Sequence, residues 1–347
     1  MSDEYKRILV CNVAHIGDVI LTTSVLPALK SAYPQAEIGV LVGSWSLPVV
    51  ENHALIDWVH TFDHPVHDRS KRSRKAKKRR GSKTYRKALQ EIQEKKYDLA
   101  FDMYSLYPTN VGKFLKNAEI PHRVGFWFSP SNYYFNHPIF WFDLLSENES
   151  AHLVEIHGWL LSGFGIEEEH LALLKPTLEY KAQIHPLSLP EEYVVVHMGV
   201  GEPKREWNVA SWKELVEKLE KLGLPLVFLG RGNREKALIE SASATLKNSI
   251  NLCDQLSWKQ LIPVIRGAKM FVGLESMAGH MAAVTNTPSV VIYGGTALIH
   301  RWRPFSAYAQ VVEPPQKFFA DRVAPPEAIH QITADDIFQK VKLALSR

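Results

Sequence analysis

The sequence predicts an α/β protein with two Rossmann-like domains, each built on a parallel sheet covered by helices. The chain has 347 residues, which is long for one hydrophobic core and suits two domains of ordinary size. Apolar runs of strand length alternate with segments of helical period along the whole chain. With 46% hydrophobic and 22% charged residues, the composition excludes disordered, collagenous and coiled-coil proteins.

The first half of the chain contains five expected strands and three expected helices. The strands are residues 7–13, 36–42, 58–62, 97–102 and 123–126, and the helices are residues 17–32, 84–95 and 151–163. Pro34 ends the first of these helices, because proline cannot continue the helical hydrogen bonding. Residues 127–150 are rich in aromatic residues, Asn and Pro and keep no single period, so we expect a loop there.

A stretch punctuated by prolines, residues 175–190, leads to a second alternation of strands and helices. Its expected strands are residues 193–198, 224–229, 250–252, 270–272 and 289–293, and its expected helices are residues 212–222, 235–245, 258–266, 279–284 and 334–345. We therefore expect a first domain over residues 1–170, a second domain over residues 171–330 and a C-terminal helix within residues 331–347. The two domains would face a central cleft.

Positive charge is concentrated in residues 69–87, which we call the basic segment. It holds twelve of the 41 Lys and Arg residues and no Asp or Glu, so the rest of the chain has a net charge of −8. Because like charges repel, we expect the basic segment to be mobile until it meets a polyanion. The alternative for such a block is a solvated loop without a partner.

Several familiar sites and segments are not indicated. Cys11 and Cys253 form no C-x-x-C pair, so we expect neither a disulfide framework nor a structural zinc site. His60, His64 and His67 lack accompanying Cys or carboxylate ligands, so we expect solvated histidines and assign no metal. No G-x-G-x-x-G follows the first strand, which argues against a nicotinamide or flavin dinucleotide site. Neither a membrane span nor a signal peptide is visible, so we expect a cytoplasmic protein.

The first candidate site follows the first strand, where Gly17 and Asp18 open a helix. A glycine lets the backbone approach a ligand closely. A carboxylate at the carboxyl edge of a first strand would face the expected cleft and could act as a general base. The alternative is that Asp18 only complements the positive end of the helix dipole.

Two further candidate sites follow strands of the second half. Gly199, Lys204 and Arg205 lie between a strand and a helix, which is typical of a phosphate cradle; a surface loop with two incidental cations is the alternative. The strand at 270–272 is followed by a second polar set, Glu275, Ser276, Gly279 and His280. Backbone N–H groups at that helix N-terminus could hold an anion, and the alternative is an ordinary helix cap.

On these three stretches, the sequence resembles glycosyltransferase family 9, the bacterial heptosyltransferases of the lipopolysaccharide core, over essentially its whole length. Residues 17–29, Gly-Asp-Val-Ile-Leu-Thr-Thr-Ser-Val-Leu-Pro-Ala-Leu, are similar to the family's opening motif. Residues 204–207 resemble its Lys-x-Trp-Pro element, and residues 273–280 resemble its Asp-Ser/Thr-Gly-x-x-His motif. The basic segment with residues 85–102 is similar to the basic segment that heptosyltransferases place near the acceptor.

The resemblance implies a GT-B fold, in which the first domain binds the acceptor and the second binds a nucleotide-sugar donor. It also implies inversion at the anomeric carbon, with no metal and no other cofactor. Asp18 matches the general base. The expected donor-binding residues are Gly199, Lys204 or Arg205 on the diphosphate, and Glu275, Ser276, Gly279 and His280. The expected acceptor-binding residues are Gly17, Arg72, Lys75, Lys78 and Arg79.

We therefore expect an inverting glycosyltransferase that transfers a heptose from ADP-heptose to the lipopolysaccharide inner core. The enzyme would be a monomer and would associate peripherally with the anionic inner membrane surface. Glu275 stands where the family motif has Asp, and Met277 where it has Gly, so a family member with another nucleotide-sugar donor is one alternative. A silent relative that only binds sugar nucleotide is another. A nucleic-acid-binding protein is the alternative from a different class, but the basic segment lacks interleaved aromatic residues, so no nucleic acid is expected as a partner.

Overall fold

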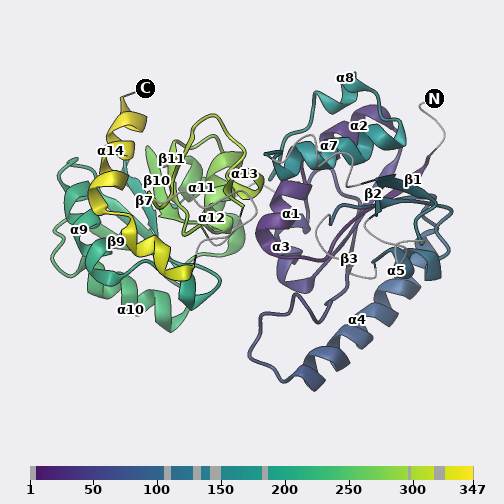
Figure 1. Cartoon of the computed structure of the whole chain (residues 1–347), viewed down its shortest axis with the longest axis horizontal. Coiled ribbons are helices and arrows are strands. Elements are labelled where there is room, and N and C mark those ends of the chain that lie inside the picture. Colours follow the sequence, from purple (N-terminus) through teal and green to yellow (C-terminus); the bar gives the residue numbers. More distant parts are fainter. Residues whose placement is uncertain are drawn as a thin grey trace. The chain divides into compact units, whose positions relative to one another are not determined.

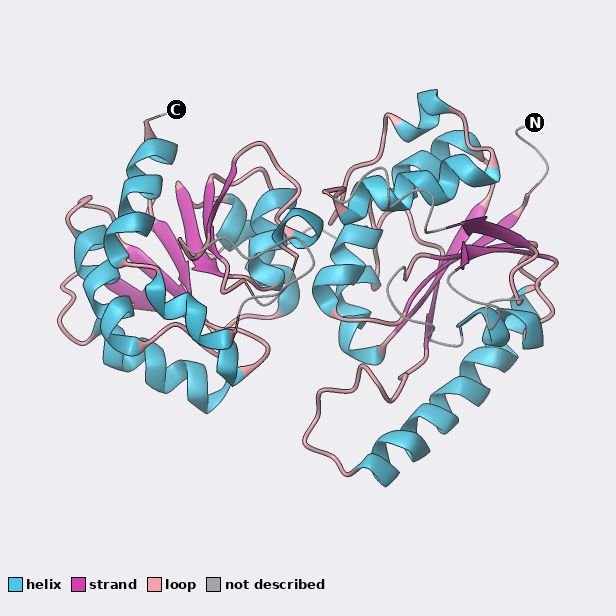
Figure 2. Ribbon diagram, in the orientation of Figure 1, coloured by secondary structure: helices cyan, strands magenta, loops and turns pink. Residues whose placement is uncertain are grey.

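The computed structural model describes residues 5–104, 111–127, 134–140, 150–181, 187–295, 298–315 and 325–346. The chain divides into two compact units, residues 1–182 and 183–347. Each unit contains one six-stranded parallel sheet with helices against its faces (Figure 1, Figure 2). Among the described residues, no helix combines the length and the apolar character needed to cross a membrane.

The first unit has the strand order of a Rossmann fold, β3-β2-β1-β4-β5-β6. The strands are β1 Arg7–Asn12, β2 Glu37–Val42, β3 Trp58–Thr61, β4 Leu99–Asp102, β5 His122–Trp127 and β6 His137–Phe140. The central strands β1, β2 and β4 are nearly continuous runs of buried apolar residues, because helices cover both faces of a parallel sheet. The strand order reverses between β1 and β4, which is where such sheets bind ligands.

The helices of the first unit lie between these strands or follow the last of them. They are α1 Ile16–Thr22, α2 Val25–Ala32, α3 Leu47–Val50, α4 Arg74–Lys95, α5 Val111–Asn117, α7 Leu153–Phe164 and α8 Glu168–Leu171. The single helix expected over residues 17–32 is wrong, because the chain breaks into α1 and α2 at Thr23 and Ser24. Pro27 has no N–H to donate to the carbonyl of Thr23, which instead accepts from Leu26 at 3.1 Å.

The second unit repeats the Rossmann order as β9-β8-β7-β10-β11-β12. Its strands are β7 Val194–His197, β8 Leu226–Leu229, β9 Ser249–Asn251, β10 Met270–Leu274, β11 Ser289–Ile292 and β12 Ala309–Val312. Its α-helices are α9 Val209–Glu220, α10 Gly232–Ser243, α11 Trp258–Arg266, α12 Met277–Val284, α13 Ile299–Trp302 and α14 Ala334–Leu345, and a 3-10 turn, η3, covers Pro203–Arg205. The strand order reverses between β7 and β10, so this pair of strands is the ligand-binding point of the second sheet.

Two strands differ from the sequence-based expectation. β6 lies inside residues 127–150, where we expected only a loop, and β12 was not expected. Both are edge strands of four residues, and most of their side chains are partly or fully exposed. Edge strands need no continuous apolar run, so the pattern that marks buried strands is absent from them. Residues 128–133 and 141–149 of the expected loop lie outside the described residues.

The segment before the second unit is bound to the first. The N–H of Thr177 donates to Thr23 Oγ1 at 2.9 Å, and the N–H of Lys181 donates to the carbonyl of Asn52 at 2.9 Å. The first unit therefore extends to residue 182 rather than 170. The helix expected at the C-terminus is α14, which packs on α9 and β11 inside the second unit.

The basic segment is largely helical. α4 begins at Arg74 and not at residue 84, so the expectation of a mobile segment is wrong for residues 74–87. Arg80 pairs with the buried carboxylate of Asp63 at 2.5 Å. Gly81 packs so closely that a Cβ there would lie 2.8 Å from the carbonyl oxygen of Asp63. These inward contacts anchor the helix despite the repulsion among its cations.

Candidate functional site

The carboxyl ends of β1 and β4 carry the first group of polar side chains. Asn12 ends β1 and Asp102 ends β4, and the two strands pair in register between Cys11 and Asp102. Asp18 lies in the first turn of α1, the helix that follows β1. The sequence-predicted base therefore lies beside the point where the strand order of the first sheet reverses.

Asp18 has a defined position at the start of α1. Its Oδ2 atom accepts a hydrogen bond from the N–H of His15 at 3.1 Å, which forms a capping box with His15 as the N-cap residue. Gly17 is the second residue of the helix, and both Gly17 and Asp18 are half-buried. The helix-capping role considered for Asp18 is thus present, and it holds the carboxylate at the edge of the sheet.

Asp102 is a second carboxylate at this edge, and none of the three sequence motifs includes it. Burial raises its pKa to about 7, although a hydrogen bond from the N–H of Tyr104 at 3.2 Å acts in the opposite direction. Near neutral pH this carboxyl group is therefore divided between its protonated and ionised forms. The sequence signal for Asp102 is its position as an acidic residue at the end of an apolar run of strand length.

The expectation of solvated histidines is wrong for His60 and His67, which are buried. The ring of His67 meets the ring of His15 edge-on at 5.4 Å and that of Tyr104 at 5.1 Å, close to the start of α1. Burial lowers the pKa of His67 to about 4, helped by nearby His64 and Arg69. Among the described residues, no group of three or more His, Cys, Asp or Glu side chains is arranged to hold a metal ion.

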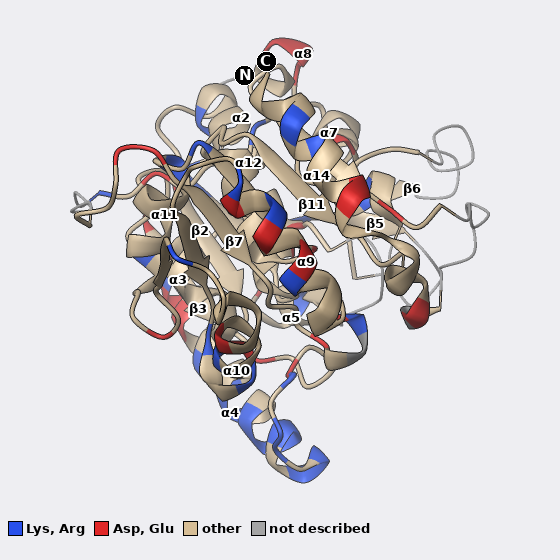
Figure 3. Ribbon diagram, turned by 90° about the vertical axis from the view of Figure 1, so that its left-hand side faces the viewer, with Lys and Arg blue, Asp and Glu red and all other residues tan. Residues whose placement is uncertain are grey.

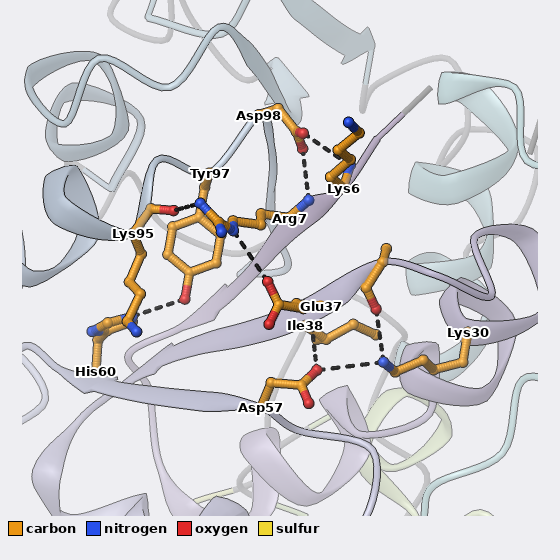
Figure 4. Close-up of polar contacts among 11 residues, drawn as sticks. Lys6, Arg7, Lys30, Glu37, Ile38, Asp57, His60, Lys95, Tyr97 and Asp98 are labelled. Carbon is orange, nitrogen blue, oxygen red and sulfur yellow. Dashed lines mark hydrogen bonds and ion pairs between the residues drawn. The ribbon is translucent and has the colours of Figure 1, made fainter. Parts of the chain in front are cut away.

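The polar side chains near the amino ends of the strands have structural roles (Figure 4). Arg7 pairs with Glu37 at 3.1 Å and donates to the carbonyl of Lys95 at 2.9 Å. His60 Nε2 lies 2.8 Å from the hydroxyl oxygen of Tyr97, so this histidine is part of the packing between β3 and the segment before β4. Exposed ion pairs such as Arg7–Glu37 contribute little to stability.

Buried neutral histidines make stability depend on pH. Burial lowers the pKa of His157 to about 3 and of His197 to about 4, as it does for His67. Below pH ~6.5 the unfolded chain binds protons that these folded histidines do not, so the free energy of unfolding should fall as the pH drops from ~6.5 to ~4. Urea denaturation across this range measures the fall, and His157→Phe should make it shallower.

Asp102 is expected to act in the opposite direction. Its folded pKa of about 7 lies above its unfolded value, so the folded state holds the extra proton between pH ~4 and ~7. Acidification through this range therefore stabilises the fold through Asp102. Asp102→Asn should make the acid-induced fall steeper, and an unchanged slope in the same urea series would contradict this assignment.

In the second unit, the segment after β7 is held by α10. Gly199 packs against Glu235, because a Cβ there would lie 2.3 Å from the carboxylate and would displace that side chain. Arg234 donates to the carbonyl of Val200 at 2.8 Å and pairs with Glu206 at 2.8 Å. Arg234 and Glu235 of α10 therefore hold the backbone of the sequence-predicted phosphate cradle in place. No sequence motif points to these two residues.

The residues that follow β10 meet those that follow β7. Arg205 forms an ion pair with the buried carboxylate of Glu275. Ser276 Oγ lies 3.3 Å from Nδ1 of His197, the last residue of β7. The structure thus brings together Arg205, Glu275 and Ser276 at the switch point of the second sheet. Lys204 belongs to η3, and its side chain lies outside the described atoms.

α12 begins directly after this cluster. Its first residue is Met277, with Ser276 as the N-cap residue, so the helix starts two residues before the expected Gly279. Gly279 and His280 therefore lie within the helix, and both are buried. The predicted anion site at a helix N-terminus corresponds to the start of α12.

The four cations assigned to the acceptor, Arg72, Lys75, Lys78 and Arg79, are all exposed. They lie in α4 or just before it, and Figure 3 shows Lys and Arg gathered at the protruding end of this helix. A helix of 22 residues is about 33 Å long, whereas a six-residue strand spans about 20 Å. The basic end of α4 therefore extends beyond the sheet (Figure 1).

Known proteins resemble this chain along most of its length. The profile of glycosyltransferase family 9 (heptosyltransferase) matches residues 85–323. Lipopolysaccharide heptosyltransferase 3 of Escherichia coli is 23% identical over 301 residues, which cover 84% of this chain and 84% of that protein. Lipopolysaccharide heptosyltransferase 2 of Escherichia coli (strain K12) is 24% identical over 306 residues, covering 83% and 82%.

Solved structures share the fold. A glycosyl transferase of family 9 from Veillonella parvula DSM 2008 superposes with a TM-score of 0.76 at 16% identity, covering 100% of this chain and 99% of that one. The E. coli heptosyltransferase WaaC with ADP gives a TM-score of 0.72 at 17% identity, covering 97% and 99%. The predicted GT-B fold class, with two Rossmann-like domains, is confirmed. Since the family profile covers more than half of its residues, the chain belongs to glycosyltransferase family 9 and is a glycosyltransferase.

Proposed function

We propose that this protein transfers a heptose from ADP-heptose to the lipopolysaccharide inner core, with inversion and without a metal. The observation that carries the proposal is the position of Asp18, held by the capping box of α1 at the switch point of the first sheet. The similarity to lipopolysaccharide heptosyltransferases and to WaaC with ADP supports the choice of sugar, acceptor and nucleotide.

In this proposal the first unit activates the acceptor. Asp18 accepts the proton of the acceptor hydroxyl while that oxygen attacks the anomeric carbon of the donor. The attack displaces the nucleoside diphosphate in one step, which inverts the configuration at that carbon. Gly17 places backbone close to the acceptor, because it has no side chain beside the carboxylate.

The second unit holds the donor. Its diphosphate lies at the N-terminus of α12, where unpaired backbone N–H groups and the helix dipole favour an anion. Lys204 or Arg205 neutralises the negative charge of the leaving group. A guanidinium has five N–H donors, so Arg205 can pair with Glu275 and still contact a phosphate. Gly199, Ser276, Gly279 and His280 complete the donor site.

The second candidate is a family member that uses another nucleotide sugar. Glu275, which pairs with Arg205, stands where the family motif has Asp. Thermal-shift measurements with ADP-, UDP-, GDP- and CMP-sugars distinguish the two. A ligand at 100 times its Kd stabilises the fold by about 2.7 kcal/mol. ADP-heptose should give the largest shift, and a larger shift with another nucleotide sugar would favour the second candidate.

We further propose that the basic end of α4 docks the anionic acceptor and the inner membrane surface that carries it. α4 is strongly polar, so it would act by electrostatic attraction and not by insertion. Each cation near an anionic membrane contributes about 1 kcal/mol, over a Debye length of about 8 Å at physiological salt. Arg80, which pairs with Asp63, anchors the helix while the exposed cations face outward.

Changing Arg72, Lys75, Lys78 and Arg79 to Gln should raise the acceptor KM, flatten its salt dependence and weaken binding to phosphatidylglycerol vesicles. Donor affinity should stay unchanged. The matched control removes the same charge from exposed lysines of the second unit, Lys213, Lys221, Lys236 and Lys247, and should leave vesicle binding intact. Unchanged acceptor kinetics together with lost, salt-dependent RNA or DNA binding would favour the nucleic-acid alternative.

A further inference from the structure

We propose that Asn12 and Thr22 are positioning residues that hold Asp18 in place for catalysis through a short chain of hydrogen bonds. The inference rests on the role of Asp18 as general base in the proposed function. It concerns residues that act through the β1–α1 turn, which spans residues 13–15 and carries the start of α1.

The hydrogen bonds form a short chain that is buried at Asn12 and Thr22 and reaches the half-buried Asp18. Asn12 Nδ2 donates to Thr22 Oγ1 at 2.8 Å, and Thr22 Oγ1 donates to the carbonyl oxygen of Asp18 at 2.9 Å. The other atom of the same amide, Asn12 Oδ1, accepts from the N–H of Ala14 at 3.0 Å. Asn12 is 2% exposed and Thr22 is 5% exposed, so water does not easily replace these partners.

This chain ties three parts of the site together. One side chain at the end of β1 binds both the turn, at Ala14, and the last residue of α1, at Thr22. Asp18 lies between these two anchor points. Thr22 binds its carbonyl oxygen, and the N–H of His15, the residue after Ala14, binds its carboxylate. The position of the carboxylate relative to the sheet therefore depends on the Asn12 amide.

Precise placement matters for a general base. The base must reach the proton at about 2.6–3.2 Å, and a misplacement of about 1 Å can lower turnover about 100-fold. Loosening the turn would leave the acceptor and donor surfaces in place while the carboxylate moves. The expected signature is thus a lower kcat with little change in KM.

The next residue offers a matched control. Thr23 is also buried, and its hydroxyl donates to a helical carbonyl, that of Ile20, at 2.6 Å. It accepts, however, from the N–H of Thr177, and among the described residues it hydrogen-bonds to neither Asn12 nor Asp18. Thr22 and Thr23 therefore have the same chemistry and burial but differ in what they hold.

The experiment compares Thr22→Val, Thr22→Ser, Thr23→Val, Asn12→Ala and the double variant Asn12→Ala/Thr22→Val, with kcat, both KM values and Tm measured for each. Thr22→Val and Asn12→Ala should each lower kcat about 10- to 100-fold with both KM values within about twofold. The double variant should lose no more than the worse single variant, since both remove one link. Thr22→Ser keeps the hydroxyl and should have the kcat of the parent protein. Thr23→Val should lower Tm without lowering kcat. If the valine variants do not fold, Thr22→Ala and Thr23→Ala make the same comparison.

Equal loss of kcat in the Thr22 and Thr23 variants would overturn the positioning role, and so would additive losses in the double variant. Asp18→Asn, measured beside them, separates this inference from the proposed function. If Asp18→Asn is inactive and the Thr22 and Thr23 variants lose kcat equally, only the positioning role is overturned. A fully active Asp18→Asn overturns the general base itself, and with it both proposals.

Discussion

Replacing Asp18 with Asn is expected to lower turnover by roughly 10²- to 10⁴-fold, the range that the loss of a general base produces. Asn keeps the size of the side chain, and its amide oxygen can still accept from the N–H of His15, so the capping box of α1 should persist. The amide cannot take a proton from the acceptor hydroxyl. Steady-state kinetics, Tm and donor affinity by calorimetry together check this expectation.

A second capping box in the same unit provides the control. α7 begins with His152 as N-cap residue, and Glu155 accepts from its N–H at 2.6 Å, as Asp18 does from His15. Glu155→Gln makes the same chemical change at a helix start that we assign no catalytic role. It should leave turnover unchanged. Near-normal turnover of Asp18→Asn, or an equal loss in Glu155→Gln, would contradict the base assignment.

Removing the cations of the second unit should weaken donor binding. Each charge-assisted contact with a phosphate contributes about 1.5–3 kcal/mol, so the double variant Lys204→Ala/Arg205→Ala should bind ADP roughly 10²- to 10⁴-fold more weakly. Calorimetry with ADP measures this effect without the acceptor. Affinity equal to that of the parent would show that the diphosphate lies elsewhere.

Arg205 needs a separate control, because its removal also leaves Glu275 buried without its ion-pair partner. Breaking a buried pair from one side costs about 3–5 kcal/mol of stability. Arg205→Ala should therefore lower Tm, and adding Glu275→Gln should restore much of it. Donor affinity should stay low in both variants. Recovery of donor affinity together with Tm would mean that Arg205 supports the fold and not the diphosphate.

The buried parts of the fold could be predicted from the sequence, because their residues report their environment. β7, β8 and β11 are runs of four buried residues in one parallel sheet, and the sequence shows them as mainly apolar runs. The edge strands β6 and β12 carry no such pattern. The break between α1 and α2 depends on one missing N–H at Pro27, inside an otherwise continuous helical period.

The candidate site could be predicted where polar residues follow apolar strands. Asp18, Glu275 and Ser276 stand out in this way, and the structure places each beside the switch point of its own sheet. Glu235 could not be predicted from the sequence. It lies in α10, and its role depends on contact with Gly199, which follows β7. The roles of Asn12 and Thr22 likewise arise only when a strand end packs against the helix that follows it.

Heptosyl transfer with inversion can be observed in a transfer assay in EDTA. The purified protein is incubated with ADP-heptose and a lipopolysaccharide inner-core acceptor that lacks heptose. Mass spectrometry then shows whether one heptose is added, and NMR gives the configuration of the new linkage. We expect one added heptose, inverted relative to the donor and absent with Asp18→Asn. No transfer, transfer only after a metal is added, or a retained configuration would contradict an inverting, metal-independent heptosyl transfer by this protein.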